Sequence, residues 1–371
     1  MNYSFLTYKI AMSLLRPMSL SVASEILRRF GSIEEFFNAD TAQLINILGS
    51  GKITRKKLDD VLAKAVDEEK WVESNGVKPI FFTDDNYPKR LLDCDDAPLM
   101  LYMLGETNLN AAHVISIVGT RHATAYGLSF VSKFITELRE MLGDVLIVSG
   151  LAYGIDVSAH KESLLNDIPT IGVVAHGLST IYPASHRDIA ARMVKNGGGL
   201  VTEYAHDAFI SKGNFLARNR IVAGICDALI VVETAEKGGS LVTAKLAAAY
   251  GRPVFALPGR TTDAYSRGCN RLISSNSASL LIDAADFARA MMWKVKEPSE
   301  GVQQSLFPEL SPQQKLVYEY LVKEGEATIN SMAEALGFSI SELMQTIGDM
   351  EFDDILISIP GSKYRINKTI Q

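Results

Sequence analysis

Short apolar runs alternate with amphipathic stretches of helical period between residues 113 and 292. The runs are rich in β-branched residues and are too short for helices, so they predict strands that are buried on both faces of a sheet. The predicted strands are residues 114–118, 145–148, 170–174, 200–203, 228–232, 254–257 and 279–282. The predicted helices between them are residues 128–142, 154–165, 185–196, 214–225 and 240–250. This alternation predicts an α/β fold with a doubly wound parallel sheet.

Glycine-rich turns follow most of the predicted strands, at the edge where a parallel sheet places its ligands. The first strand runs into Gly119, Thr120 and Arg121, and a helical pattern starts near Gly127. Such a turn aims backbone N–H groups and the positive end of a helix at the space above the sheet, which favours an anion such as phosphate. Further turns of this kind are residues 149–154, 175–177, 197–199, 238–240 and 258–260. Together they predict a platform on which an extended backbone lies close to protein amides.

The charge distribution indicates an anionic partner at one face. The net charge of the whole chain is −6, which argues against a general nucleic-acid binder. Residues 211–271, however, carry nine Lys and Arg against four acidic residues. In this stretch Lys212, Arg218 and Arg220 lie close to Phe209 and Phe215. Cationic side chains interleaved with aromatic rings suit single-stranded nucleic acid, because the charges meet phosphates and the rings meet bases. We expect one of the two Phe residues in the core and the other near the ligand.

Several enzyme classes lack their motifs in this chain. Gly119 is not followed by the glycines of a nicotinamide site, and no P-loop pattern is present. Ser149 is not part of a Gly-x-Ser-x-Gly elbow, so hydrolase chemistry lacks its nucleophile. Asp156 and His160 share a helix face at i and i+4, which suits an acid–base pair or a structural pair. We favour the structural interpretation, in which Asp156 stabilises the first turn and His160 bonds to it.

Four segments flank or follow the alternating region. Residues 1–78 predict a small helical domain, in which residues 51–57 resemble the hairpin of helical modules that hold a DNA backbone; an exposed helix start has the same pattern. Residues 79–112 predict an extended connector, and residues 293–310 predict a linker. Residues 311–371 have the three helices and the hairpin of a winged helix.

The recognition helix of that predicted winged helix is acidic. It contains no Lys or Arg, and its acidic residues are at positions 342, 349, 351, 353 and 354. Duplex phosphates repel such a helix, so we expect this module to contact protein or to tune the main domain.

The cysteines and the lengths of the apolar runs indicate in which cellular compartment the protein is found. Cys94, Cys226 and Cys269 are far apart and odd in number, which argues against a disulfide framework and fits a reducing cytoplasm. No apolar run is long enough to cross a bilayer. We therefore expect a cytoplasmic protein without a membrane partner.

The middle segment resembles the DNA-processing protein A family (DprA, also called Smf). The match runs, in this order, through GTRHATAYG, SGLAYGIDVSAH, YPASHRDIA, GGGLVTEY, FLARNRIVAGICDALIVVE, GGSLVTAKLAAAYGRPVFALPG and SRGCNRLI. An ordered series of this length is more specific than any single motif. The helical segment and the winged helix resemble family members with three modules in pattern only.

The resemblance implies an extended Rossmann-like domain that binds single-stranded DNA without hydrolysing it and without a cofactor. Family members protect incoming strands during natural transformation and load the recombinase RecA onto DNA covered by single-strand-binding protein, typically as homodimers. Carried over by motif, Arg121 and Lys212 are the principal phosphate contacts. The other DNA-binding residues that the resemblance implies or supports are Gly119, Thr120, Phe215, Arg218, Asn219, Arg220, Gly238, Gly239 and Ser240.

The closest enzymatic alternative is a nucleotide phosphoribohydrolase of the type that resembles lysine decarboxylases, whose Rossmann-like sheet is similar. That enzyme needs a Pro-Gly-Gly-x-Gly-Thr-x-x-Glu turn. Residues 237–243 of this chain read KGGSLVT, and no glutamate follows at the required place. Release of a base from a nucleoside monophosphate would support this alternative.

Overall fold

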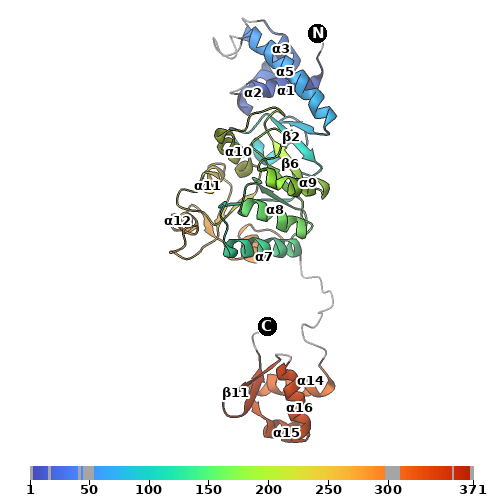
Figure 1. Cartoon of the computed structure of the whole chain (residues 1–371), viewed down its shortest axis with the longest axis vertical. Coiled ribbons are helices and arrows are strands. Elements are labelled where there is room, and N and C mark those ends of the chain that lie inside the picture. Colours follow the sequence, from blue (N-terminus) through green and yellow to red (C-terminus); the bar gives the residue numbers. More distant parts are fainter. Residues whose placement is uncertain are drawn as a thin grey trace. The chain divides into compact units, whose positions relative to one another are not determined.

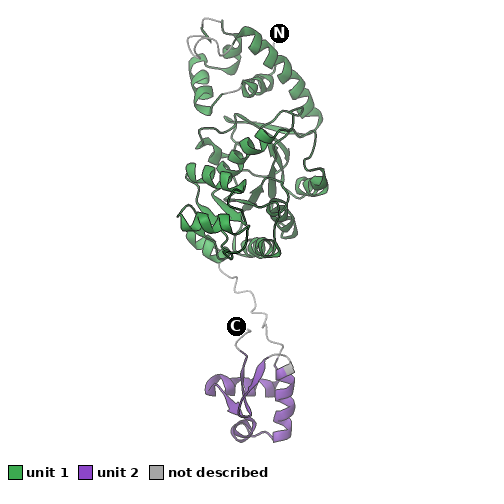
Figure 2. Cartoon of the chain, turned by 60° about the vertical axis from the view of Figure 1, so that its left-hand side comes forward, with its two compact units in different colours: residues 1–297 green, residues 298–371 purple. Residues whose placement is uncertain are grey.

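The computed structural model describes residues 3–15, 18–40, 43–44, 54–296, 310–352 and 355–367. The chain forms two compact units, residues 1–297 and residues 298–371 (Figures 1 and 2). Part of the predicted hairpin at 51–57 and most of the predicted linker at 293–310 lie outside the described residues. None of the helices in the described part of the chain combines the length and apolarity that crossing a bilayer requires.

A nine-stranded sheet runs through the first unit. The strands, in their order across the sheet, are β1 (Lys78–Phe81), β2 (Met100–Gly105), β6 (Gly199–Thr202), β5 (Thr170–Val173), β4 (Val145–Ser149), β3 (His113–Gly119), β7 (Ala228–Val232), β8 (Val254–Ala256) and β9 (Ser279–Leu280). Every neighbouring pair from β6 to β9 is parallel, whereas β1 and β2 pair antiparallel with each other and β2 with β6. The predicted α/β fold with an extended, mostly parallel sheet is confirmed.

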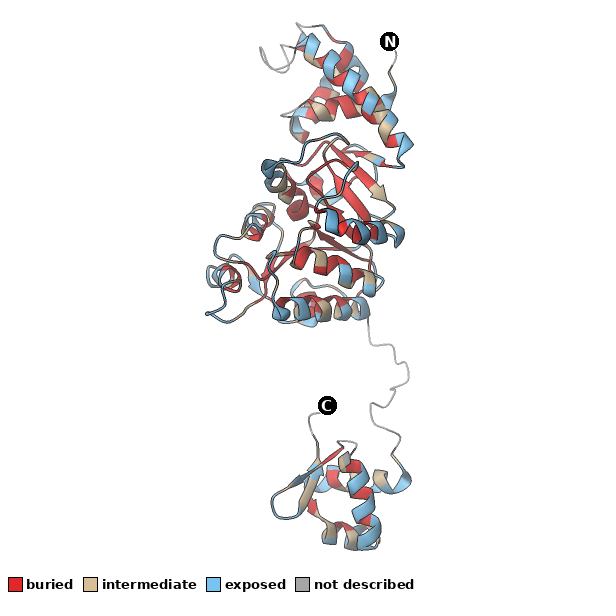
Figure 3. Cartoon of the chain, in the orientation of Figure 1, coloured by how far each residue is buried: buried red, intermediate tan, exposed pale blue. Residues whose placement is uncertain are grey.

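Helices cover both faces of this sheet, because successive side chains of a strand point to opposite faces. Val114 and Val118 of β3 belong to the core under α10 (Lys212–Gly224) and α11 (Ser240–Ala249). Ile115 and Ile117 belong to the core under α7 (Ala125–Met141) and α8 (Ile155–Leu165). Figure 3 shows much of this sheet in red, the colour of buried residues, whereas the helices that cover it carry pale blue exposed residues as well. The helices are α6 (Lys89–Leu92), α7 (Ala125–Met141), α8 (Ile155–Leu165), the 3-10 turn η1 (Ala184–His186), α9 (Arg187–Lys195), α10 (Lys212–Gly224), α11 (Ser240–Ala249), α12 (Arg267–Ser274) and α13 (Ala284–Ala290).

The segment predicted as a connector is part of the sheet. Residues 79–112 contain most of β1 and all of β2, and Tyr102 of β2 pairs with Thr202 of β6. Burial explains the difference, because Met100–Tyr102 are almost fully enclosed and their backbone groups need partners in the ladder. The N-terminal helices precede β1; they are α1 (Phe5–Leu14), α2 (Leu20–Phe30), α3 (Ile33–Asn38) and α5 (Arg55–Ser74).

The second unit has the winged-helix arrangement that its sequence predicts. Its core includes Val317, Leu321, Met332, Leu343 and Ile347. Its helices are α14 (Pro312–Glu324), α15 (Ile329–Leu336) and α16 (Ile340–Phe352). Its strands, in the order β10, β12 and β11, are β10 (Ala327–Thr328), β12 (Lys363–Ile366) and β11 (Leu356–Ile359).

Candidate nucleic-acid interface

The turn after β3 is held rigidly by its neighbours. A Cβ atom on Gly119 would lie 2.0 Å from the carbonyl oxygen of Val232, so only glycine fits where β3 meets β7. The Thr120 N–H donates to the Glu233 carbonyl over 2.7 Å, and the Thr120 carbonyl accepts from Ile155 N–H over 3.2 Å. The Arg121 side chain remains exposed above this fixed backbone. The sequence therefore presents a cation on a preformed support.

A buried carboxylate fixes the helix that follows this turn. Glu233 is 3% exposed and accepts hydrogen bonds from the backbone N–H of Thr124, over 2.8 Å, and from its hydroxyl. Thr124 is the N-cap of α7, so β7 and the start of α7 are tied together. This arrangement orders the loop between Arg121 and the helix.

The turn after β7 supplies a second set of backbone groups. Ser240 is the first residue of α11, and its hydroxyl donates to the Thr234 hydroxyl over 2.7 Å. The Gly238 N–H donates to the Ala235 carbonyl over 3.0 Å, which closes the turn before the helix. The positive end of α11 thereby lies at the carboxyl edge of the sheet, next to the turn after β3.

A cavity of about 380 Å³ joins the two turns with α10. It brings together nine of the eleven predicted DNA-binding residues. They are Gly119, Thr120, Arg121, Phe215, Arg218, Asn219, Gly238, Gly239 and Ser240. Lys212 and Arg220 are not among its lining residues.

Lys212 lies just outside the cavity, at the start of α10. It is the first residue of that helix after the N-cap Ser211, and it is exposed. The ion pairs found among the described residues include neither Lys212 nor Arg121. Both cations are therefore available to an anionic ligand.

Arg218 lies in the floor of the cavity rather than on its rim. Its side chain donates to the carbonyl oxygen of Gly150, over 2.6 Å, and to that of Val173, and the residue is only 5% exposed. Burial lowers the pKa of Arg218, and the nearby Asp156 carboxylate opposes this effect. The sequence predicts a supporting phosphate contact, whereas these bonds give Arg218 a structural role that joins the ends of β4 and β5.

Arg220 faces away from the cavity. It forms an ion pair of 2.9 Å with Glu203 and a longer one of 3.9 Å with Asp96. It lines a separate cavity of about 490 Å³, together with Val22 of α2 and residues of the segment before β2. Two positions along a helix differ by roughly 200° in direction, so Arg218 and Arg220 cannot share one ligand face. The structure does not bring Arg220 to the predicted site.

The expectation for the two Phe residues is wrong in one part. Phe215 lines the cavity and is half-buried, as a residue near the ligand should be. Phe209, expected in the core if Phe215 meets the ligand, is 92% exposed. Its segment precedes α10 and packs too little to enclose a ring.

Asp156 and His160 do not bond to each other. The Asp156 carboxylate accepts from the N–H groups of Gly150, over 3.1 Å, and Ala152, over 3.4 Å. His160 is fully buried and its Nδ1 pairs with the Thr170 hydroxyl over 2.7 Å. Burial lowers the pKa of His160 to about 3. The structural interpretation holds for both residues, but the predicted bond between them is wrong, because each faces a different strand end.

The cavity lining also includes residues that were not predicted to bind DNA, among them His122, Thr234 and Tyr265. His122 follows Arg121 directly, and Thr234 follows β7 at the carboxyl edge, so strand position was an available signal for both. Tyr265 lies in the loop after β8 and stacks on His122 with ring centroids 6.0 Å apart. Only tertiary packing brings that ring to the site.

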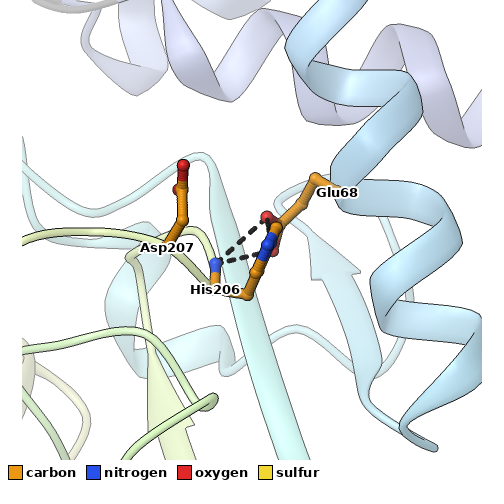
Figure 4. Close-up of side chains that lie close together, drawn as sticks. All are labelled: Glu68, His206 and Asp207. Atoms are coloured by element: carbon orange, nitrogen blue, oxygen red, sulfur yellow. Dashed lines mark hydrogen bonds and ion pairs between the residues drawn. The ribbon is translucent and has the colours of Figure 1, made fainter.

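A buried carboxylate from the N-terminal helices anchors the segment that leads to α10 (Figure 4). Glu68 of α5 is 3% exposed and accepts from the backbone N–H of His206 over 3.0 Å and pairs with its Nδ1 over 2.5 Å. Trp71 stacks on the same imidazole at 4.9 Å. Glu68, His206 and Asp207 offer ligand atoms within 4.8 Å of one another, as a metal site requires. Because the Glu68 oxygens already accept these bonds, we interpret the group as an anchor between α5 and the loop after β6.

Taken together, the sheet and its cavity define a Rossmann-like protein whose carboxyl edge carries glycine turns, the start of α11 and the exposed Arg121. The chain belongs to the DNA recombination-mediator protein A family, whose model matches residues 78–292. It is 32% identical over 344 residues to a DNA processing protein DprA of Mycobacterium tuberculosis, covering 88% of this chain and 85% of the relative.

Two solved structures of the same family are similar in fold. DNA processing protein A of Streptococcus pneumoniae matches with a TM-score of 0.65 and 29% identity, covering 78% of this chain and 98% of that one. DNA processing protein A of Helicobacter pylori, described for its single-stranded DNA binding mode, matches with a TM-score of 0.52 and 30% identity. That match covers 58% of this chain and 95% of the relative.

Proposed function

We propose that this protein binds single-stranded DNA at the carboxyl edge of its sheet and does not cleave it. The observation that supports this most directly is the meeting of the Gly119–Arg121 and Gly238–Ser240 turns around one cavity. Backbone N–H groups at helix starts and exposed cations suit phosphates without reading a base sequence. The Helicobacter pylori relative, a DNA processing protein A with a single-stranded DNA binding mode, adds support from the family.

Arg121 and Lys212 are the proposed phosphate contacts. We expect the double variant Arg121→Ala/Lys212→Ala to bind oligothymidylate much more weakly. Its dependence of log K on log salt should be less steep by about 1.4, since each phosphate contact on a single strand contributes about 0.7. Fluorescence anisotropy across a salt series measures both quantities.

A matched control removes two cations from the opposite edge. Arg139 and Lys195 are exposed and lie in the last turns of α7 and α9. The variant Arg139→Ala/Lys195→Ala changes the net charge equally and should leave the salt slope as in the wild type. Equal slopes for the wild type and the folded Arg121/Lys212 variant would refute the assignment.

We further propose the family's mediator role for this chain: protection of incoming strands in transformation and loading of RecA onto DNA coated by single-strand-binding protein, as a cytoplasmic homodimer. The family's description as a recombination mediator supports this. Strand exchange by RecA on coated DNA, with and without this protein, tests the loading step, and sedimentation tests the dimer. Base release from nucleoside monophosphates would favour the phosphoribohydrolase alternative instead.

A further inference from the structure

The carboxyl edge of the sheet carries different chemistry on its two flanks. The turns after β3 and β7 offer backbone amides and Arg121. The loops after β4 and β5, on the other flank, carry Tyr153 and Tyr182. These rings are 48% and 49% exposed, although large aromatic side chains usually bury more of their surface. Each of the two tyrosines therefore leaves much of its surface open to a ligand.

Tyr182 continues the surface that Phe215 begins inside the cavity. The two ring centroids are 5.6 Å apart, and the rings are tilted by 59°. Phe215 lines the cavity, whereas Tyr182 lies beyond its lining residues. An aromatic surface therefore leads out of the cavity towards the end of β5.

The backbone under Tyr182 is fixed before any ligand arrives. Its N–H donates to Nε2 of His176 over 3.1 Å, and Nδ1 of His176 pairs with the Gly177 carbonyl over 2.9 Å. His176 is fully buried, and burial lowers its pKa, which favours the neutral ring that these two bonds require. A ring on such a support loses little freedom when it binds.

The two tyrosine loops are also joined to each other. Nδ1 of His186 pairs with the Leu151 carbonyl over 2.9 Å, which links the loop after β5 to the loop after β4. The Tyr153 hydroxyl lies 3.2 Å from the Ser185 hydroxyl, and its ring packs edge-on against His186 at 4.9 Å. The two loops that carry the rings are thus tied to each other before a ligand binds.

We propose that Tyr182 and Tyr153 form a base-stacking surface that extends the proposed single-stranded DNA site from β3 towards β5. This inference rests on the proposed function and states in which direction the bound strand runs along the edge of the sheet. β3 and β5 are two strand spacings apart, about 10 Å, which is the length of about three stacked nucleotides. Phe215 lines the same cavity as Arg121, and the Tyr182 ring lies 5.6 Å from the Phe215 ring, so a strand with a phosphate at Arg121 reaches Tyr182 within a few nucleotides. Its bases stack on the rings, and a duplex, whose base faces are occupied, cannot use this surface.

The test compares an oligothymidylate with a strand of the same length that carries abasic sites. Tyr182→Ala keeps the backbone bond to His176, so the loop retains its anchor. We expect this variant to bind the intact strand about 5- to 150-fold more weakly than the wild type. We expect Tyr182→Phe to bind normally, since the ring face is preserved. The wild type should bind the abasic strand more weakly than the intact strand. The wild type and Tyr182→Ala should bind the abasic strand with the same affinity.

A matched control uses an equally exposed ring on the other flank. Tyr126 is 49% exposed, and its hydroxyl donates to the Pro258 carbonyl after β8. Tyr126→Ala should bind both strands like the wild type. A larger loss with Tyr126→Ala than with Tyr182→Ala would place the bases on the opposite flank and overturn the inference.

The two proposals fail in different ways. The first case is that the wild-type protein binds the intact strand and the Arg121/Lys212 variant binds it more weakly. If Tyr182→Ala then binds this strand as tightly as the wild type, only the stacking surface is refuted. If the wild-type protein does not bind the intact strand, or if the Arg121/Lys212 variant binds it as tightly as the wild type, the proposed function itself is refuted and the stacking surface with it.

Discussion

Replacing Arg218 should damage the fold more than it damages a contact with DNA. Its side chain donates to two strand-end carbonyls, and its charge lies near Asp156, a buried carboxyl whose pKa burial raises. Arg218→Met keeps the length of the chain but removes the charge and the donors. Each carbonyl left without its donor costs about 1–3 kcal/mol in isolation. Because the two losses overlap, we expect a loss of about 2–4 kcal/mol in the free energy of unfolding.

Urea unfolding, monitored by tryptophan fluorescence, measures this loss for the compact unit of residues 1–297. Both tryptophans, Trp71 and Trp293, belong to residues 1–297, so the signal does not report on the winged helix. Arg121→Ala is the matched control, since Arg121 is exposed and its removal should change stability by less than about 0.5 kcal/mol. A folded Arg218→Met protein with wild-type stability and weakened DNA binding would refute the structural role.

Three further perturbations test other parts of the fold. Burial lowers the pKa of His160 to about 3, so between pH 6.5 and 3 the unfolded chain binds more protons than the folded chain. Lowering the pH through this range therefore reduces the free energy of unfolding, by up to about 1.4 kcal/mol per pH unit. His160→Gln should remove this contribution from the slope of unfolding free energy against pH. Glu68→Ala leaves the His206 N–H unpaired and should cost about 2 kcal/mol in urea unfolding, whereas an unchanged midpoint would contradict the anchor. Gly154→Ala should destabilise the protein and weaken DNA binding together, because Gly154 has a φ of +75° and an added Cβ would lie 2.2 Å from the Thr120 carbonyl; full activity in a gel shift would contradict this.

The site was predictable where local sequence fixes local geometry. β3, the Gly119 turn and the start of α7 adjoin in the chain, so the period of the apolar residues and one glycine sufficed to predict them. The same holds for the turn before α11. Parallel strands then place their carboxyl ends at one edge, which is why Gly119 and Gly238 could be expected to meet.

The roles of individual side chains on α10 were not predictable in this way. Arg218 and Arg220 are two residues apart and chemically alike, yet one closes the floor of the cavity and the other pairs with Glu203. The choice depends on which face of α10 packs on the sheet, and on carbonyls and carboxylates that come from distant parts of the chain. β1 and β2 were missed for a similar reason, since a strand is stabilised by partners across the sheet.

By itself, then, the sequence determined the alternation of strands and helices between residues 113 and 292, the glycine turns that follow several of the strands, and the family of this protein. Tertiary structure alone decided that Arg121 and Lys212 stay exposed whereas Arg218 and Arg220 bond to other groups of the protein. It also placed Tyr182 beside Phe215. The physical reason is range: hydrophobic period and backbone conformation are set by near neighbours, whereas burial, charge pairing and ring contacts depend on residues that meet only when the sheet has formed.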